Sequence, residues 1–356
     1  MAGRRRHVIG GVDTHGKTHH AAVIDRTGRV LGDQEFRATT AGYQQLLVWL
    51  NSFGRVSEVG IEGTGSFGAG LTRHLAGAGI TVVEVDRPDR AQRRRQGKSD
   101  PIDAIAAARA VLSGRATATP KLRTGPVEAV RVLQVTRRGA VKARTAALNQ
   151  LRAIIVTAPE PLRGQLSGLT PAALLAACRD LPFEEDRLHD PAQAVAAALR
   201  ALAERIVALT TETTQLSGWL SALVATTAPR LTAMLGVGPE VAAQLLATAG
   251  DNPDRLHSEA ALARLTGAAP LPASSGRTDR HRLSRSGDRQ ANKALYTIVL
   301  TRLRYDPRTR LYVARRTAEG MSKKDIFRCL KRFIAREVYK HLTSTNIPQL
   351  HLPQAT

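Results

Sequence analysis

Residues 8–37 read VIGGVDTHGKTHHAAVIDRTGRVLGDQEFR and contain three segments with the length of β-strands, at 8–12, 20–25 and 29–37. Arg26-Thr27-Gly28 lies between the second and third segments and is typical of a hairpin turn. Three strands at hairpin spacing predict an antiparallel meander at the start of the chain.

The residues that follow extend this meander by alternating helices and strands. We expect helices near 41–50, at 67–78 and from 100 to about 112, and strands at 57–61 and 80–85. The resulting β-β-β-α-β-α-β-α order is that of a ribonuclease H-like α/β domain, in which crossover helices add parallel strands to a meander. The sequence therefore predicts such a domain over residues 1–125.

The rest of the chain is predicted to be mainly helical. Residues 126–156 are expected to form a long basic helix, and apolar residues recur at heptad spacing from 199 to 223, interrupted by Thr213. This seam favours a coiled coil, and a long helix packed on its own domain is the alternative. The predicted regions are a helical coiled-coil region, a mainly α C-terminal domain and a tail, at 126–225, 226–342 and 343–356.

The chain carries a large excess of basic residues. Its 356 residues include 52 Lys and Arg and 30 Asp and Glu, which give a net charge of +22 at pH 7. Residues 155–260 hold seven basic and twelve acidic side chains, so the positive charge is concentrated on either side of them. Such a chain attracts a polyanion, and an aromatic content of 4% favours contact with a nucleic-acid backbone over base stacking.

Several classes of protein are excluded by the composition. An apolar content of 43% excludes a disordered basic tail, and two cysteines, Cys178 and Cys329, exclude a disulfide scaffold or a CxxC zinc module. No uncharged apolar run reaches the ~18 residues of a membrane span, and the basic N-terminus is not followed by the apolar run of a signal peptide. We therefore expect a cytoplasmic protein without a membrane partner.

Four carboxylates are predicted to meet at one edge of the sheet. Asp13 ends the first strand and Glu62 ends the fourth, while Asp100 and Asp103 share one face at the start of a helix. Ligands gather at the carboxyl ends of strands in α/β sheets. Because four neighbouring carboxylates repel one another, the cluster implies Mg²⁺ or Mn²⁺. Two such ions about 4 Å apart would clamp the attacking and leaving oxygens of a phosphodiester.

The same residues also allow structural interpretations. Asp100 before Pro101 fits a helix N-cap, Asp103 then favours the helix dipole, and Asp13 fits a turn at a strand end.

A second alternative concerns residues 63–68, which read GTGSFG and match the G-x-G-x-x-G of dinucleotide-binding folds. Glu84 and Asp86 lie about 20 residues further on, where such folds place a ribose ligand. The motif follows the fourth strand rather than the first, so we prefer a tight turn with close helix–sheet packing.

Phosphate-binding groups are predicted in the basic parts of the chain. Gly236 and Gly238 lie in a predicted helix–turn–helix, which either offers backbone N–H groups to a phosphate or is a plain helical hairpin. The loop at 270–289 carries Ser274 and Ser275 among arginines, as a serine nucleophile for a phosphodiester requires, although a surface loop fits too. The side chains expected to bind nucleic acid are Arg93, Arg94, Arg95, Arg137, Arg138, Lys142, Arg144, Arg277, Arg282, Arg285 and Arg289.

These motifs together resemble one known family. GVDTH at 11–15, IEGTG at 61–65, KSDPIDA at 98–104, LGVGP at 235–239, ASSG at 273–276 and RSGDR at 285–289 are similar to those of the insertion-sequence transposases called bridge-RNA-guided recombinases. That family joins a RuvC-like DEDD domain to a C-terminal serine transposase domain, and the resemblance covers nearly the whole chain.

The resemblance implies roles for individual residues and partners. Asp13, Glu62, Asp100 and Asp103 would be the metal-site acids, and Ser275, with Ser274 adjacent, would form a covalent 5′-phosphoserine link to DNA. The partners implied are DNA, a guide (bridge) RNA and further copies of the chain as a dimer or tetramer, in which one protomer's serine meets another's acids. The setting implied is the bacterial cytoplasm, with action at the nucleoid.

Three functions follow from these features. The first is a transposase or recombinase that cuts and rejoins DNA through the acids and the serine. The second is a RuvC-like metal-dependent nuclease or junction resolvase without a protein nucleophile. The third is a nucleic-acid-binding or dinucleotide protein without strand chemistry.

Overall fold

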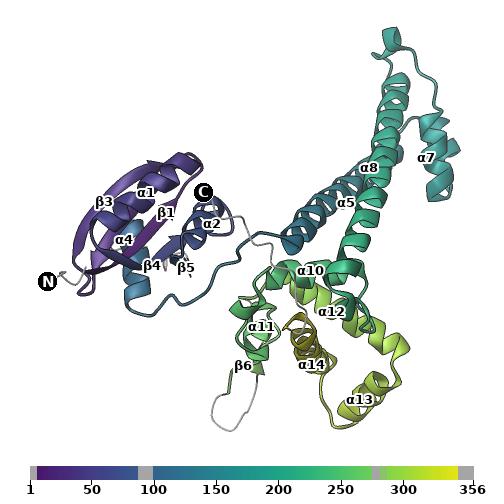
Figure 1. The fold of residues 1–356 in the computed structure, drawn as a ribbon. Helices are drawn as coiled ribbons and strands as arrows, with labels where there is room; N and C mark the ends of the chain where they lie inside the picture. Colours follow the sequence, from purple (N-terminus) through teal and green to yellow (C-terminus); the bar gives the residue numbers. More distant parts are fainter. Residues whose placement is uncertain (1–5, 87–98, 275–280, 283, 285, 344–356) are drawn as a thin grey trace. The chain divides into compact units, whose positions relative to one another are not determined.

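The computed structural model describes residues 6–86, 99–274, 281–282, 284 and 286–343, which form two compact units (Figure 1). The first unit comprises the described residues up to 128, Ala249–Leu265 and the described residues 342–343, and the second comprises Ala129–Thr248 and the described residues of 266–341. Ala249–Leu265 thus packs with the N-terminal part, whereas the sequence-derived boundaries assign it to the C-terminal domain.

The first unit is built on a five-stranded mixed sheet. Its strands are β1 (His7–Thr14), β2 (Thr18–Asp25), β3 (Val30–Arg37), β4 (Arg55–Glu62) and β5 (Thr81–Val85), in the order β3-β2-β1-β4-β5. The first three strands pair antiparallel, and β4 and β5 extend the sheet in parallel with β1. The predicted meander with its parallel extension is confirmed, and the strand order fits a ribonuclease H-like fold.

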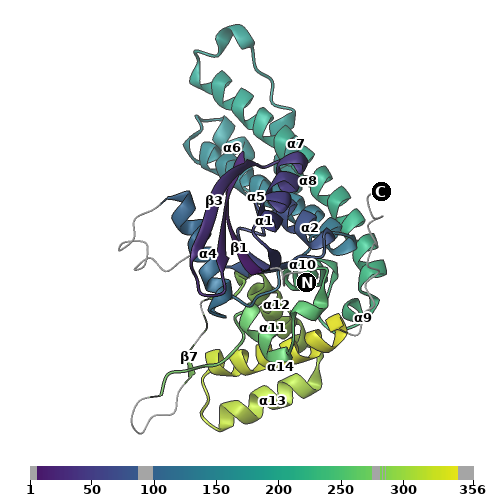
Figure 2. The ribbon, with the colours of Figure 1, turned by 60° about the vertical axis from the view of Figure 1, so that its left-hand side comes forward.

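The two faces of the sheet are covered by different helices (Figure 2). On one face, Val12 and Ile61 belong to a buried cluster with side chains of α1 (Thr40–Ser52) and α2 (Ala69–Gly77). On the other face, Ile9 packs with Ala107 and Val111 of α4 (Asp100–Leu112). Because side chains alternate along a strand, Gly11 and Asp13 of β1 lie on the same face as Ile9, beneath α4.

Two glycines allow α4 to approach the sheet closely. A Cβ atom at Gly11 would lie 2.1 Å from the carbonyl oxygen of Ala104, and one at Gly60 would lie 2.8 Å from that of Ala107. Helix and strand backbones touch at these points, which a residue with a side chain does not permit. The contact places the first turn of α4 beside the carboxyl ends of β1 and β4.

Residues 63–68 form the predicted tight turn between β4 and α2. Gly63 has a φ of +66°, and its carbonyl oxygen accepts a hydrogen bond from the Gly68 N–H at 3.1 Å. Glu84, the candidate ribose ligand of the dinucleotide interpretation, accepts a hydrogen bond from Thr64 Oγ1 at 2.7 Å. The turn interpretation is therefore sufficient for this motif, and the antiparallel meander differs from a dinucleotide-binding sheet.

Arg255 anchors Ala249–Leu265 to the rest of the first unit. Its guanidinium donates hydrogen bonds to the carbonyl oxygens of Thr119 at 3.0 Å and Ala249 at 3.1 Å, and lies 3.8 Å from the Glu84 carboxylate. Burial lowers the pKa of Arg255, and the charge of Glu84 opposes that effect. The Arg255 side chain therefore joins Ala249–Leu265 to Thr119 and Glu84 within the first unit.

The remaining elements are mainly helical. They are α5 (Pro126–Thr157), α6 (Leu162–Leu166), α7 (Pro171–Arg179), η1 (Glu185–Arg187), α8 (Pro191–Thr227), α9 (Pro229–Thr232), α10 (Pro239–Ala249), η2 (Pro253–Arg255), α11 (Glu259–Leu265), β6 (Leu271–Pro272), β7 (His281–Arg282), α12 (Arg289–Tyr305), α13 (Pro307–Ala318) and α14 (Lys323–Thr343). Among the described residues, no helix combines the length and apolarity needed to cross a membrane.

The heptad seam lies on α8, which packs beside α5 (Figure 1). Leu199 and Ile206 of α8 are buried in one cluster with Leu151 and Ile155 of α5, and Thr213 within the seam is buried as well. The apolar seam is thus covered within a single chain, as the alternative of a long helix packed on its own domain expects. A coiled coil between copies is not needed to bury it.

Candidate active site

Asp13 and Glu62 lie at adjacent strand ends. Val12 of β1 pairs with Ile61 of β4, so Asp13 and Glu62 occupy the next positions along these two parallel strands. Thr14 Oγ1 joins the same two ends by donating to the Glu62 carbonyl oxygen at 2.8 Å. Both acidic residues are buried, at 6% and 7% exposure, on the face that α4 covers. Local strand pairing therefore brings together two residues 49 positions apart, as the sequence predicts.

Asp100 and Asp103 lie in the first turn of α4. The N-cap of this helix is Ser99 rather than Asp100, so the N-cap interpretation of Asp100 is off by one residue. Asp103 is 3% exposed and Asp100 is partly exposed, which makes Asp100 the member of the pair that faces solvent.

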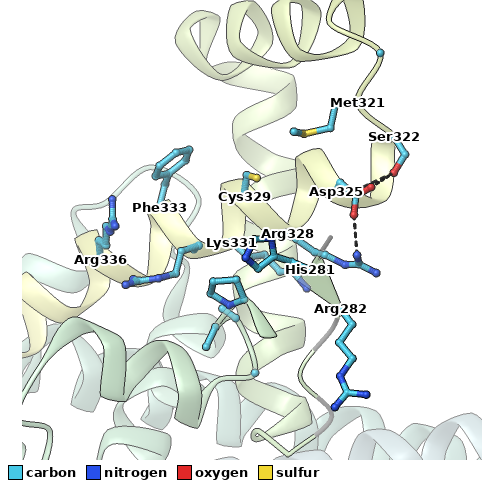
Figure 3. Close-up of a pocket in the computed structure, with 16 residues that line it drawn as sticks. His281, Arg282, Met321, Ser322, Asp325, Arg328, Cys329, Lys331, Phe333 and Arg336 are labelled. Atoms are coloured by element: carbon cyan, nitrogen blue, oxygen red, sulfur yellow. Dashed lines mark hydrogen bonds and ion pairs between the residues drawn. The ribbon is translucent and has the colours of Figure 1, made fainter. Parts of the chain in front are cut away.

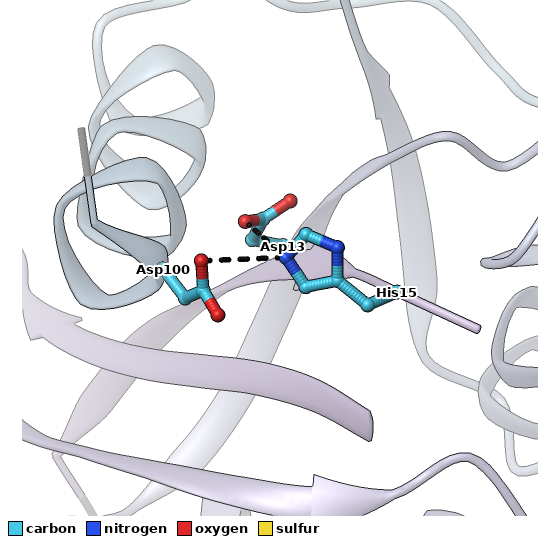
Figure 4. A group of neighbouring side chains, drawn as sticks. All are labelled: Asp13, His15 and Asp100. Atoms are coloured by element: carbon cyan, nitrogen blue, oxygen red, sulfur yellow. Dashed lines mark ion pairs between the residues drawn. The ribbon is translucent and has the colours of Figure 1, made fainter. Parts of the chain in front are cut away.

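His15 joins the site and was not among the residues predicted to form it. Its Nε2 atom lies 3.2 Å from Oδ2 of Asp13 and 3.3 Å from Oδ1 of Asp100 (Figure 4). The signal that could have found it is its position two residues after Asp13, since residues i and i+2 lie on one side of an extended chain.

The electrostatics link the acids of the strand to those of the helix. Burial raises the pKa of Asp13, because a desolvated carboxylate is disfavoured. The charge of His15 opposes this effect, while the carboxylates of Asp103 and Asp100 raise the pKa further. Asp13, Asp100 and Asp103 therefore interact as one cluster of like charges.

This cluster fits a divalent cation. Asp13, His15 and Asp100 each offer one ligand atom, and these atoms lie within 4.8 Å of one another. Within the described part of the chain, Glu62 and Asp103 are not members of this closest group, although both are buried beside it. Carboxylate oxygens suit Mg²⁺ and Mn²⁺, and a cation would offset the burial and repulsion that raise the Asp13 pKa.

The predicted serine loop is only partly within the described residues. Ser274 is exposed after β6, and Arg282 is exposed on β7. Arg289 is exposed at the first position of α12, where Asp288 accepts hydrogen bonds from the N–H groups of the next turn. Several predicted site residues lie outside the described ones: Ser275, Arg277, Arg285, Arg93, Arg94 and Arg95.

The glycines of the C-terminal hairpin differ in their surroundings. Gly236 has a φ of +90°, and a Cβ there would lie 3.2 Å from Ile298 Cγ2 and 3.3 Å from Ile298 O of α12. A Cβ at Gly238 would meet no atom within 4 Å. Turn geometry and packing therefore account for Gly236. Gly238 directly precedes α10, and a side chain at this position would meet no steric obstacle.

The basic residues of α5 have unequal roles. Arg137 donates a hydrogen bond to Ser217 Oγ at 2.7 Å and pairs with Glu240, so it holds α5, α8 and α10 together. Arg138 is exposed and contacts Gln244 of α10, Lys142 is exposed, and Arg144 is half-buried. Arg137 thus has a structural function, and Lys142 has the accessibility that a phosphate contact requires.

A ribonuclease H-like sheet with carboxylates gathered at the ends of β1 and β4 fits the class of metal-dependent nucleases and transposases with an acidic site. Comparison with known proteins narrows this class. Residues 10–158 match a transposase family named for the DEDD domain of IS110, and residues 228–314 match the transposase IS116/IS110/IS902 family. Two separate parts of the chain thus match transposase families of the IS110 type.

One relative supports the same family. An uncharacterized 43.6 kDa protein of insertion element IS110 from Streptomyces coelicolor is 39% identical over 94 residues, which are 26% of this chain and 23% of that protein. The matched region of this chain therefore spans about a quarter of the length of that relative. The acidic site lies in the first matched domain, and Gly236, Ser274 and Arg289 lie in the second.

Proposed function

We propose that this chain is the transposase of an insertion sequence and that it cuts and rejoins DNA strands. The observation that carries the proposal is the single electrostatic cluster of Asp13, Asp100 and Asp103, with Glu62 at the adjacent strand end of a ribonuclease H-like sheet. The two matched transposase domains support DNA as the substrate, and so does the net charge of +22.

The acids would hold Mg²⁺ or Mn²⁺ together with His15. A metal held there would supply positive charge that offsets the negative charge on the phosphodiester and on the attacking oxygen. Strand pairing positions Asp13 and Glu62. The close contact of the α4 backbone with Gly11 and Gly60 positions Asp103. Asp100, the partly exposed acid, faces the side from which DNA would arrive.

Ser275 would be the nucleophile. Its oxygen attacks the phosphorus, the bond from phosphorus to the 3′ oxygen breaks, and the serine proton passes to that leaving oxygen. The products are a 5′-phosphoserine link and a free 3′-hydroxyl, and rejoining is the reverse attack by a 3′-hydroxyl. Arg289, which is exposed, would offset charge on the phosphoryl oxygens.

We further propose that an RNA guides the chain to its DNA and that the chain acts as an oligomer. A bridge RNA would select the target and donor DNA, and the exposed Arg138 and Lys142 would contact a nucleic-acid backbone. The acids and Ser274 belong to different compact units, which is compatible with a site shared between protomers of a dimer or tetramer.

Strand transfer by the purified chain with Mg²⁺, the RNA of its own element, and donor and target DNA tests the function. Asp13→Asn and Ser275→Ala should abolish transfer, and Ser274→Ala should retain it as the matched control. A denaturing gel should show a protein–DNA adduct that Ser275→Ala lacks. Cleavage without an adduct would instead identify a metal-dependent nuclease, and activity of both serine variants would refute the serine mechanism.

A further inference from the structure

A cavity of about 740 Å³ lies in the second unit, between α14 and the segment that leads into β6 (Figure 3). Gly267–Pro270 and β7 form one side, and α14 with the residues just before it forms the other. The volume lies within the range of about 300–1000 Å³ that is usual for small-molecule sites. Residues 228–314 are the second matched domain, so α14 lies beyond it.

Cations dominate the polar lining of this cavity. Arg282 of β7 and four residues of α14 are basic, and among the described lining residues the one acid is Asp325. Asp325 is engaged with neighbours, because it accepts hydrogen bonds from Arg328 at 2.7 Å and from Ser322 at 2.6 Å. The basic residues from α14 are Arg328, Lys331, Arg332 and Arg336. The described lining therefore attracts anions.

Lys331 is the buried cation of the group. It is 8% exposed, and its Nζ donates a hydrogen bond to Asn292 Oδ1 at 2.9 Å. Asn292 is held in this orientation because its Nδ2 donates to the Thr266 carbonyl oxygen at 2.8 Å. Burial and the charge of Arg328 both lower the pKa of Lys331. A neutral amide does not compensate a buried ammonium, so a bound anion would stabilise this lysine.

The walls between the cations are largely apolar. Ala268, Ala269 and Pro270 line one side, and Met321 and Phe333 line the other. Phe333 is 42% exposed, with the ring of Tyr312 edge-on at 5.7 Å between centroids and the Arg336 guanidinium 6.0 Å from its ring centroid, so a base would meet the ring surface that these two contacts leave exposed. Apolar walls with an aromatic ring suit a nucleobase, and the cations suit its phosphate.

We propose that this cavity binds one unpaired nucleotide of a nucleic-acid strand, with the base against Phe333 and Pro270 and the phosphate against Lys331 and Arg282. The inference rests on the proposed function, which supplies a strand that is opened during transfer. A nucleotide in a duplex keeps its base stacked and paired, so this cavity distinguishes an opened strand from an intact duplex.

Binding of the full-length protein to short fluorescent probes tests the proposal. The probes are single-stranded DNA, single-stranded RNA, the matching DNA duplex and free dAMP. Lys331→Met and Arg282→Ala should each weaken single-strand binding by about 10- to 100-fold, the usual cost of a lost charge-assisted hydrogen bond. Arg310→Ala, an exposed residue of α13 outside the cavity, is the matched control for loss of one charge. Arg310→Ala should weaken the binding of single strands and of the duplex alike, by about twofold.

A second measurement locates the base. Ultraviolet crosslinking of a strand with 5-iododeoxyuridine should attach the base to the peptide that contains Phe333. Arg282→Ala decides the question if Lys331→Met fails to fold, because the Arg282 side chain is exposed.

Three outcomes would overturn the proposal. They are equal losses on single strands and duplex, crosslinks confined to other peptides, and binding of dAMP as tight as that of the strands. Preference for DNA or for RNA would support it and identify the strand. Wild-type duplex binding and strand transfer are measured alongside, so the cavity proposal can fail while the transposase proposal stands.

Discussion

Replacing Gly11 with alanine should force α4 away from the sheet and disorganise the acidic site. The new Cβ would lie 2.1 Å from the carbonyl oxygen of Ala104 and 2.3 Å from the backbone nitrogen of Ala108. Non-bonded heavy atoms rest about 3.5–4.0 Å apart, so the helix must withdraw by roughly 1–1.5 Å. Asp100 and Asp103 lie in the first turn of this helix and would move with it.

Both stability and activity should fall by measurable amounts. Overpacking of this kind costs about 1–3 kcal/mol, and occasionally more. For a domain of this size, such a loss lowers Tm by roughly 2–12 °C. A displacement of about 1 Å near a reacting centre lowers rates by about 100-fold, so strand transfer should fall by a similar factor.

Urea denaturation and the strand-transfer assay measure these two effects in the same preparations. Gly77→Ala is the matched control, because Gly77 ends α2 in the same unit and a Cβ there would meet no atom within 4 Å. That variant should be neutral or more stable by up to about 1 kcal/mol. A Gly11→Ala protein with the wild-type urea midpoint and wild-type activity would refute the close contact between α4 and β1.

Three further substitutions test other parts of the structure. Because burial raises the pKa of Asp13 above its ordinary value of 3.8, the metal-free protein should lose stability as the pH rises through that raised pKa. Asp13→Asn should abolish this pH-dependent loss of stability, and it should also abolish the stabilisation of the protein by added Mn²⁺. If urea titrations give the variant the same dependence of stability on pH as the wild type, the burial of the Asp13 carboxyl is contradicted. Asp288→Ala should cost about 1–2 kcal/mol, because Asp288 caps α12 and accepts from Thr248 Oγ1 at 2.7 Å; a midpoint within error of wild type would refute that role. Arg255→Met should lower the free energy of unfolding by about 1–3 kcal/mol, because the carbonyl oxygens of Thr119 and Ala249 lose their hydrogen-bond donor. Proteolysis that is no faster than in the wild type would contradict this role of Arg255.

The sheet was predictable because its signals are local. Strand alternation and the Arg26-Thr27-Gly28 turn specify the meander, and the positions of Asp13 and Glu62 at strand ends follow from pairing of β1 with β4. The seam on α8 was predictable as a buried stripe, but a heptad pattern does not say which helix covers it. Here the covering helix is α5 of the same chain.

Other features depend on tertiary contacts that a pattern does not encode. Arg137 was predicted to bind nucleic acid from the charge of α5, yet its guanidinium contacts Ser217 and Glu240, which are distant in the sequence. The position of His15 two residues after Asp13 is a local signal, but only the fold brings Asp100 of α4 to 3.3 Å from His15 Nε2. A charge run or a single histidine predicts surface accessibility, whereas partners across the fold decide its use.

One local pattern does carry this tertiary information. Gly11 precedes Asp13 by two residues, and Gly60 precedes Glu62 by two residues, on neighbouring parallel strands. The period of two puts each glycine and its acid on the same face, so the glycine that admits the helix backbone also aims the acid toward the helix start. The separation between helix and sheet then fixes the distances among all four acids. A glycine two residues before an acid at two adjacent strand ends therefore indicates both a closely seated helix and a carboxylate site beneath its first turn.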